Sequence, residues 1–467
     1  MKASIMKPFT LNFKPRHFWL YVVAAVASLG GLLAGFDMGV ISGALPFIED
    51  TWPMNAITQG WVVSAAIVGS VIGAAANGIL ADWFGRKKII VSTGIIFTAA
   101  SFFCAYAQSV GQLIAARILI GIAVGMVTFV VPLYLSEISP QKVRGMLVSL
   151  FQLAITAGIL LAYLVGGLFA DHAHNWRWML GSGFFPALVL LIGISFLGDT
   201  PRWLISKKRE NEARKVFNLI EPESDIEAKI QDIKQTLDSG KTPAKTPFRA
   251  WMIMPILVGV GIMFAQICTG INTIIYYTTT IFKFAGFSSK IGAIYATIGI
   301  GLVNFVMTLV AIAFTDKIGR KPLLYIGLGG VFIGLLSLGF AFRYADLLGD
   351  NLRWVALGSV IIYIAAFACS LGPVGWILVS EILPLKIRGL AMSLCTVANF
   401  GFNFAVVLSF PVMIEHIGEP FTFWFYAGIA VLCLFFVYFL VPETKGISLE
   451  KIEKNWVNHV PARKFQD

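Results

Sequence analysis

Two charged residues, Asp37 and Arg117, stand inside long apolar stretches of the sequence. A charge at the centre of a membrane helix costs roughly 2.5–3.5 kcal/mol on insertion scales, so such residues are expected to find a partner. Arginine keeps its proton in proteins, whereas aspartate can gain one. A carboxylate that pairs with Arg117 and releases it on protonation would be a proton switch. A permanent structural ion pair is the alternative.

A second group of side chains combines neutral hydrogen-bonding groups with aromatic faces. Its members are Gln152, Gln266, Asn272, Tyr276, Tyr277, Asn304, Trp376 and Asn399. Amides supply paired donors and acceptors for hydroxyl groups, and an indole supplies an apolar face for C–H groups, which are the two surfaces of a sugar. Taken singly, each amide can instead join neighbouring helices. As a set with few formal charges, they predict a site for a neutral, hydroxyl-rich molecule.

Glycine and proline lie next to these amides. Gly270 follows Gln266 by four residues, and Gly372, Pro373 and Gly375 precede Trp376. Both segments can interrupt a helix, because glycine tolerates unusual backbone angles and proline lacks an N–H donor. We therefore expect the site at two broken helices.

A third group of charges occurs twice in the chain. The sequence SEISPQKVRG at 136–145 is repeated as SEILPLKIRG at 380–389, and DWFGRKK at 82–88 is repeated as DKIGRKP at 316–322. The charges concerned are Asp82, Arg86, Glu137, Arg144, Asp316, Arg320, Glu381 and Arg388. Repetition in the same order indicates an internal duplication. We expect these charges to pair between the two halves as a gate, with helix capping and membrane orientation as the alternative explanation.

The composition identifies the elements that position these groups. The chain has 467 residues, of which 57% are hydrophobic and 13% charged, with a mean hydropathy of +0.80. Soluble domains carry roughly 25% charged residues. The apolar runs are long and continuous, which favours membrane helices over a transmembrane barrel. The sequence therefore predicts an all-α membrane protein.

Twelve stretches are long and apolar enough to span a bilayer. They are 19–45, 59–81, 89–107, 112–135, 146–170, 177–198, 252–282, 289–315, 322–343, 354–379, 389–415 and 421–441. Six precede a charged segment and six follow it. This predicts an N-terminal bundle (1–198), a cytoplasmic helical linker (199–250), a C-terminal bundle (251–441) and a cytoplasmic tail (442–467). We interpret the first stretch as a retained span rather than a cleaved signal.

The basic residues predict the orientation. On these spans, 30 of the 36 Lys and Arg residues fall on the side of the N-terminus and five on the other side. The positive-inside rule then places both termini in the cytoplasm. The net charge of +11 is explained by this topology, so no nucleic-acid partner is expected. The linker carries isoleucines at helical spacing among charges, which predicts amphipathic helices, with a solvated tether as the alternative.

Other chemistries find little support in the sequence. The five cysteines lie in apolar runs without the spacing of metal ligands, so we expect reduced thiols and no metal. No phosphate-binding loop or nucleophile constellation stands out. We expect neither an enzyme nor a cofactor.

These motifs carry a family resemblance. GRKK and GRKP, the repeated SEI segments, TPRWL, QICTGIN with YY, GPVGW and VPETKG resemble the sugar porter family of the major facilitator superfamily over nearly the whole chain. GFDMGVISGALPFI, PLYLSEISPQKVRG and VPETKGISLE look closest to bacterial sugar–proton symporters of the galactose permease type. The resemblance implies two pseudo-symmetric six-helix bundles that expose a central site to one side at a time.

The resemblance also implies roles for particular residues. The sugar ligands of the family fall on Gln152, Gln266, Asn272, Tyr276, Asn304, Trp376 and Asn399, and its proton-carrying aspartate falls on Asp37 with Arg117 beside it. Two positions depart from the family pattern. Ile267 replaces a second glutamine and Phe400 replaces a tryptophan, which leaves the identity of the sugar open.

We therefore expect a proton-coupled monosaccharide symporter of the bacterial inner membrane, acting as a monomer on a hexose such as glucose or galactose. A passive facilitator with a structural Asp37, or a symporter for a pentose or inositol, are the alternatives. A sugar sensor is disfavoured, because the tail after Val441 is short.

Overall fold

The computed structural model describes residues 15–140, 144–220, 226–239, 249–287, 289–384 and 387–465, with 15–18, Arg144, 236–239 and Asp316 described by their backbone alone. Within these residues every regular element is a helix. The first half contains α1 (Pro15–Thr51), α2 (Ala56–Phe84), α3 (Arg86–Ala105), α4 (Val110–Ile138), α5 (Arg144–Phe169), α6 (Asn175–Gly181) and α7 (Phe184–Ser195). The second half contains α11 (Ile253–Cys268), α12 (Ile271–Phe284), α13 (Lys290–Ile318), α14 (Arg320–Arg343), α15 (Ala345–Leu348), α16 (Leu352–Cys369), α17 (Leu371–Ile382) and α18 (Arg388–Leu440).

Eleven helical segments of the described chain are long and apolar enough to cross a membrane. The longest, α18, has 53 residues and contains the last two spans expected from the sequence. Gly418 inside it has φ 79° and ψ 166°, so the chain turns there instead of continuing as one helix. The structure thus confirms the all-α membrane fold.

Short polar residues start several of these helices. Asn55 precedes α2 and accepts the N–H of Thr58 at 2.8 Å, and Ser109 accepts the N–H of Gln112 before α4. Ser289 accepts the N–H of Gly292 before α13 in the same way. Each cap satisfies an N–H group that has no partner inside the helix, and so fixes where a membrane helix begins.

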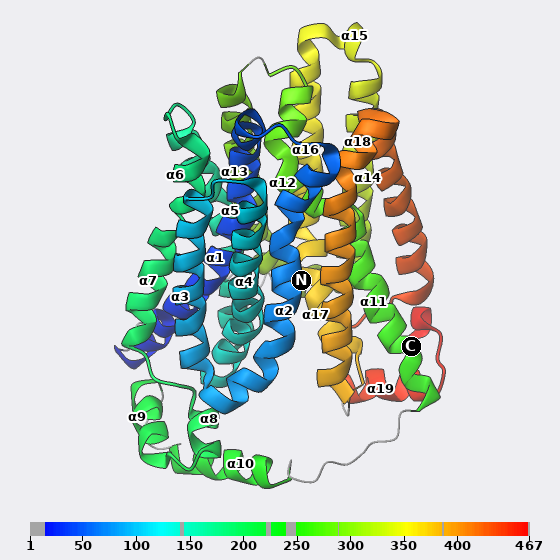
Figure 1. Cartoon of the computed structure of the whole chain (residues 1–467). Coiled ribbons are helices and arrows are strands. Elements are labelled where there is room, and N and C mark those ends of the chain that lie inside the picture. The colour runs from blue at the N-terminus through cyan, green and yellow to red at the C-terminus, as the bar shows by residue number, and fades with distance from the viewer. Residues whose placement is uncertain are drawn as a thin grey trace.

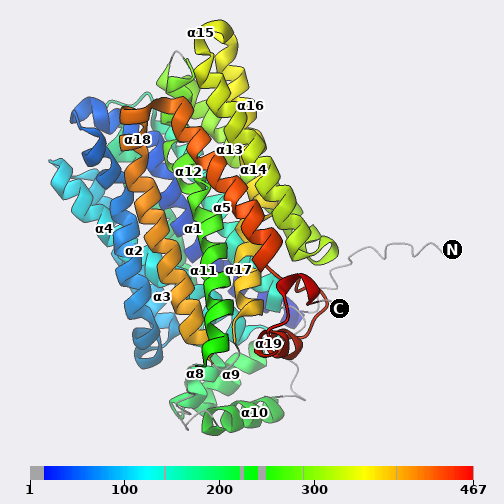
Figure 2. The same ribbon diagram turned by 90° about the vertical axis from the view of Figure 1, so that its right-hand side faces the viewer.

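The helices of each half pack mainly on one another (Figures 1 and 2). In the first half α1 packs on α5, and α4 packs on both α2 and α3. In the second half α14 packs on α16 and α18, and α11 packs on α18. The two halves meet where α1 contacts α12, α2 contacts α18 and α5 contacts α13.

The two ends of the bundle differ. One end, called the linker end below, carries α8 (Pro201–Ser206), α9 (Glu210–Ile220) and α10 (Ile226–Ser239), together with α19 (Leu449–Val457) of the tail. The opposite end, called the distal end, carries α6 and α15 (Figure 1). The segment expected to be a linker contains the helices α9 and α10, with Ile226 and Ile230 buried.

Two spans of the second half are broken. Between α11 and α12, Gly270 has φ 92°, a left-handed conformation that glycine adopts without strain. Between α16 and α17, the break falls at Ser370, with φ −133° and ψ −86°. The first break lies where the sequence predicts it. The second lies two residues earlier than expected, so that Gly372, Pro373 and Gly375 belong to the first turns of α17, where proline is tolerated.

Candidate functional site

The two charges within the spans lie in contact. Arg117 Nη1 on α4 is 3.1 Å from Asp37 Oδ1 on α1, and the two side chains are 0% and 4% exposed. The guanidinium also donates to the carbonyl of Val63 on α2 at 3.4 Å. The pair therefore ties three helices of the first half together. Protonation of Asp37 would remove the charge that neutralises Arg117, so this contact can respond to a proton.

Two of the amides form the centre of a polar cluster in the second half. Asn399 on α18 donates to Gln266 Oε1 at 2.9 Å. Gln266 Nε2 donates to the carbonyls of Leu371 and Gly372, each at 3.1 Å. Leu371 and Gly372 are the first two residues of α17, so the cluster joins α11, α17 and α18 at the start of α17. Gly375 makes this approach possible, because a Cβ there would lie 3.1 Å from Gln266 Nε2.

The other expected sugar ligands differ in their surroundings. Asn272 and Tyr276 on α12 and Asn304 on α13 are buried, whereas Gln152 on α5 and Trp376 on α17 are half-buried. The side chains of Gln152, Asn272, Asn304 and Trp376 make no hydrogen bond to another described residue. Their polar groups are therefore available to a ligand. Tyr276 lies within electrostatic range of Asp37 and Arg117 and faces Asn403 of α18.

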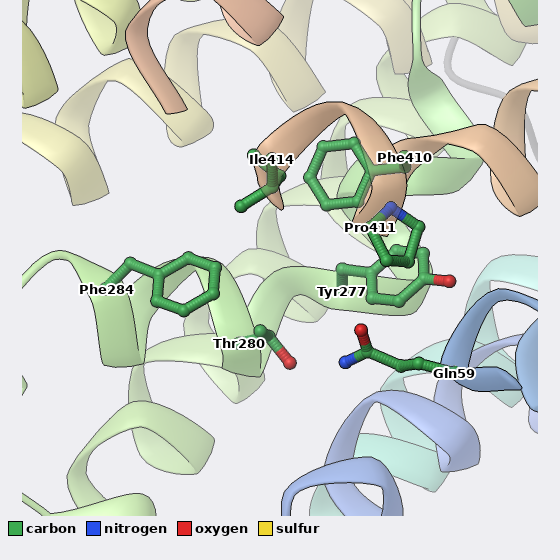
Figure 3. A pocket seen from close by; sticks show the side chains of 7 residues that line it. All are labelled: Gln59, Tyr277, Thr280, Phe284, Phe410, Pro411 and Ile414. Atoms are coloured by element: carbon green, nitrogen blue, oxygen red, sulfur yellow. The ribbon is translucent and has the colours of Figure 1, made fainter. Parts of the chain in front are cut away.

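Tyr277 lies in a different environment. Its hydroxyl donates to the carbonyl of Val407 at 3.3 Å, and its ring lies 4.9 Å from that of Phe410. Figure 3 shows it at a small pocket between α2, α12 and α18, with the side chains of Gln59 and Thr280 opposite. The cavity of about 40 Å³ has room for a few water molecules rather than a sugar. Tyr277 thus serves packing of α12 on α18 in this structure.

The duplicated charges pair within each half. Arg86 lies 3.2 Å from Asp82 and 3.0 Å from Glu137, and Arg320 lies 3.1 Å from Glu381. No ion pair between described residues joins the two halves at the linker end, where the expected gate would close. The described hydrogen bonds of Ser42 with Thr279 and of Tyr163 with Ile275 join the halves away from that end. The side chains of Arg144 and Asp316 lie outside the described part of the structure. Arg388 is described, and its Nε and Nη2 are buried without a hydrogen-bond partner.

Sequence reasoning missed the roles of four further residues. Asp199 accepts the backbone N–H of Arg86 at the start of α3, and Glu443 accepts those of Arg320 and Lys321 at the start of α14. Thr200 and Thr444 donate to the carboxylates of Glu137 and Glu381, and so complete two matching clusters.

These residues lie in a third duplicated pair of motifs, DTPRW at 199–203 and PETKG at 442–446. That repetition was a usable signal for their role. Burial raises the pKa of the Asp199 carboxyl, against the opposing effect of the backbone N–H groups that it accepts.

In the described residues, membrane-spanning helices hold a buried ion pair in one half and an amide cluster at broken helices in the other, an arrangement typical of a multi-pass membrane transporter. The family model "Sugar (and other) transporter" matches residues 23–456. The chain belongs to this family.

The relatives and solved structures agree with this assignment. The chain is 40% identical to a galactose–proton symporter of Escherichia coli over 441 residues, covering 93% of this chain and 94% of the relative. It is 38% identical to an arabinose–proton symporter of the same species, covering 92% of each. The inward-open structure of the xylose transporter XylE from E. coli has a TM-score of 0.81 and 32% identity, covering 94% of this chain and all of that one. Other relatives are named for glucose and myo-inositol.

Proposed function

We propose that this protein is a proton-coupled monosaccharide symporter of the bacterial inner membrane. The observation that carries the proposal is the buried contact between Asp37 and Arg117, since it puts a group that can take up a proton where a charge is costly. The galactose–proton and arabinose–proton symporters among its relatives support the same reaction.

The amide cluster is the proposed sugar site. Gln266 and Asn399 hold each other and the carbonyls of the broken span, so their remaining hydrogen-bonding capacity has a fixed direction. Asn272, Asn304 and Gln152 supply further amides, and Trp376 supplies an aromatic face. Tyr276 lies within electrostatic range of the ion pair and one helical turn from Asn272 on α12, which gives the sugar and the proton a common neighbour.

The linker end is the proposed cytoplasmic side, in accord with its excess of Lys and Arg. Both termini then lie in the cytoplasm, and the protein acts as a monomer in the bilayer. Residues 1–198 and 251–441 form the two bundles that move relative to each other, joined by the linker at 199–250 and followed by the tail at 442–467. The contacts at the distal end and the likeness to inward-open XylE support an inward-facing state here.

The proposed cycle couples the two solutes by alternating access. Asp37 takes up a proton from the outer side and releases Arg117, which changes the packing of α1 on α4. Sugar then binds the amide cluster. The distal end closes, the linker end opens, and both solutes leave to the cytoplasm. The charges Asp82, Arg86, Glu137, Arg144, Asp316, Arg320, Glu381 and Arg388 act as the cytoplasmic gate by pairing differently in the two states.

Glucose or galactose is the proposed cargo. A pentose or inositol is the alternative that the relatives named for arabinose and myo-inositol favour. Ile267 bears on the choice of sugar, because its side chain is apolar where an amide would add a contact to another hydroxyl group.

The experiment separates proton coupling from sugar binding. Asp37→Asn in proteoliposomes should abolish accumulation driven by a proton gradient and keep sugar exchange across the membrane. The asparagine keeps the size of the side chain and cannot carry the proton. Asp171→Asn, at an exposed aspartate, is the matched control and should accumulate sugar like the unaltered protein. Uphill accumulation by Asp37→Asn would refute the proton role and support a passive facilitator with a structural Asp37.

A further inference from the structure

The polar contacts between the two halves gather at the distal end. Ser42 on α1 shares a hydrogen bond of 3.2 Å with Thr279 on α12, and both side chains are buried. The hydroxyl of Tyr163 on α5 donates to the carbonyl of Ile275 on α12 at 2.9 Å. Both contacts join the first half to α12, the distal segment of the broken span.

A salt bridge lies beyond these contacts. Lys290, the first residue of α13, pairs with Asp50 near the end of α1. Its ammonium group also donates to the carbonyl of Pro46 at 3.1 Å and lies 5.1 Å from the centre of the Phe47 ring. The lysine side chain is 25% exposed and the aspartate 62%. Three different groups of α1 therefore hold one lysine from the second half.

A second acidic residue extends this cluster. Glu49 is hydrogen-bonded to Gln59 of α2, and both Lys283 and Lys290 lie within electrostatic range of its carboxylate. Lys283 is in the last turn of α12. Two adjacent carboxylates of the first half thus face two lysines of the second half, so opposite charges meet across the interface.

The linker end shows the opposite arrangement. There the ion pairs of Arg86 and Arg320 stay within one half. Of the ion pairs between described residues, Lys290 with Asp50 alone joins the two halves. The halves touch at the distal end, which is therefore the closed end. The ion pair that crosses the interface, Lys290 with Asp50, lies at this closed end.

We propose that Glu49, Asp50, Lys283 and Lys290 form an ionic latch that holds the distal mouth shut and must separate before that mouth opens. This inference rests on the alternating access of the proposed function. The latch lowers the free energy of the inward-facing state relative to the outward-facing state, and its partners become hydrated when the mouth opens. A partly exposed ion pair is weak, so it biases an equilibrium without trapping the carrier.

The test measures the populations of the two states directly. The background is a variant whose five native cysteines are replaced by serine. Spin labels are attached to cysteines introduced at positions 108 and 347, which are exposed distal sites in opposite halves. The distance between the labels, measured by pulsed electron–electron double resonance, reports opening of the distal mouth. Labels at 88 and 317 report the linker end of the same variants. Lys290→Gln and Asp50→Asn should each raise the ratio of distal-open to distal-closed molecules about twofold to fivefold, with the reciprocal change at the linker end.

Two further variants make the test decisive. The charge exchange Asp50→Lys with Lys290→Asp should return the ratio towards that of the unaltered protein, since it restores opposite charges. Asp346→Asn, at an exposed distal aspartate without a described ion pair, should leave it unchanged. The latch is refuted if the single variants leave both distances unchanged, or if the charge exchange opens the distal mouth as much as they do. The distances are measured without sugar or gradient, so failure of transport with a normal shift would contradict the proposed function alone.

Discussion

At the scale of single residues, the two partners of the buried ion pair are not equivalent. Asp37 can be neutralised by a proton, whereas Arg117 stays charged and keeps its need for a partner. Removing one member of a buried pair costs about 3–5 kcal/mol when the other charge stays buried and unpaired. A second hydrogen-bond partner for Arg117 lowers this cost, and the Val63 carbonyl provides one. In the proposed cycle, the guanidinium keeps this second contact when protonation of Asp37 releases Arg117.

The sequence predicted this contact better than it predicted the contacts of the amide cluster. The depths of Asp37 and Arg117 follow from counting residues along two spans, and few other charges compete for them. The partner of Gln266 depends on where the tenth span breaks, and the motif GPVGW places that break too late. Ser370 takes the break instead, and the carbonyls of Leu371 and Gly372 reach Gln266 from a position that the sequence does not reveal.

The first prediction at this scale concerns Ile267, a buried residue next to Gln266. Ile267→Gln should change the preference among hexoses, because it adds an amide that can bond one hydroxyl. A net hydrogen bond contributes about 1 kcal/mol, or roughly fivefold in affinity for the sugar that makes it. The preference among hexoses is measured by competition of unlabelled sugars against the uptake of labelled glucose. Ile267→Leu keeps the side chain apolar and should preserve the order of competitors. An unchanged order in Ile267→Gln would show that this position does not select the sugar.

At the scale of elements, Gly270 determines how α12 leaves α11. Its φ of 92° lies in the left-handed region, and a Cβ there would lie 3.3 Å from both the Tyr426 ring and the Thr273 hydroxyl. The position therefore requires glycine for two reasons, its backbone angle and its close neighbours. The sequence predicted this break because glycine stands beside polar residues in a span.

Gly270→Ala should destabilise the broken span. A left-handed conformation costs an L-residue about 1–2 kcal/mol, so the thermal unfolding midpoint in detergent should fall and sugar uptake should slow. Gly299→Ala in α13 is the matched control, since its added Cβ meets no atom within 4 Å. That variant should keep its midpoint or gain slightly, because alanine favours a helix. Equal midpoints in the two variants would mean that Gly270 bears no conformational constraint.

At the scale of the whole molecule, the duplication explains why two clusters of the same design occur at the linker end. Arg86 with Glu137 and Arg320 with Glu381 each tie helices within one half, and Asp199 and Glu443 cap the starts of α3 and α14. The sequence revealed these charges through their repetition. It did not reveal their partners, because these depend on how the helices of each half pack at the linker end.

The same reasoning separates the two kinds of ion pair in the molecule. In the proposed cycle, opening of the distal mouth breaks the pair of Lys290 with Asp50, whereas it brings the charges at the linker end closer to the other half. Coupling then requires that protonation of Asp37 and binding of sugar together offset the loss of distal contacts. Each of these contributions is small, which suits a carrier that visits both states.

The most direct test of this account is the uptake of labelled glucose by the unaltered protein in proteoliposomes, with and without an inward proton gradient, and with galactose, xylose and inositol as competitors. For one proton per sugar, a gradient of one pH unit supplies about 1.4 kcal/mol and supports up to roughly tenfold accumulation. We expect accumulation above equilibrium with the gradient and simple equilibration without it. Equilibration to the same level under both conditions would contradict proton coupling.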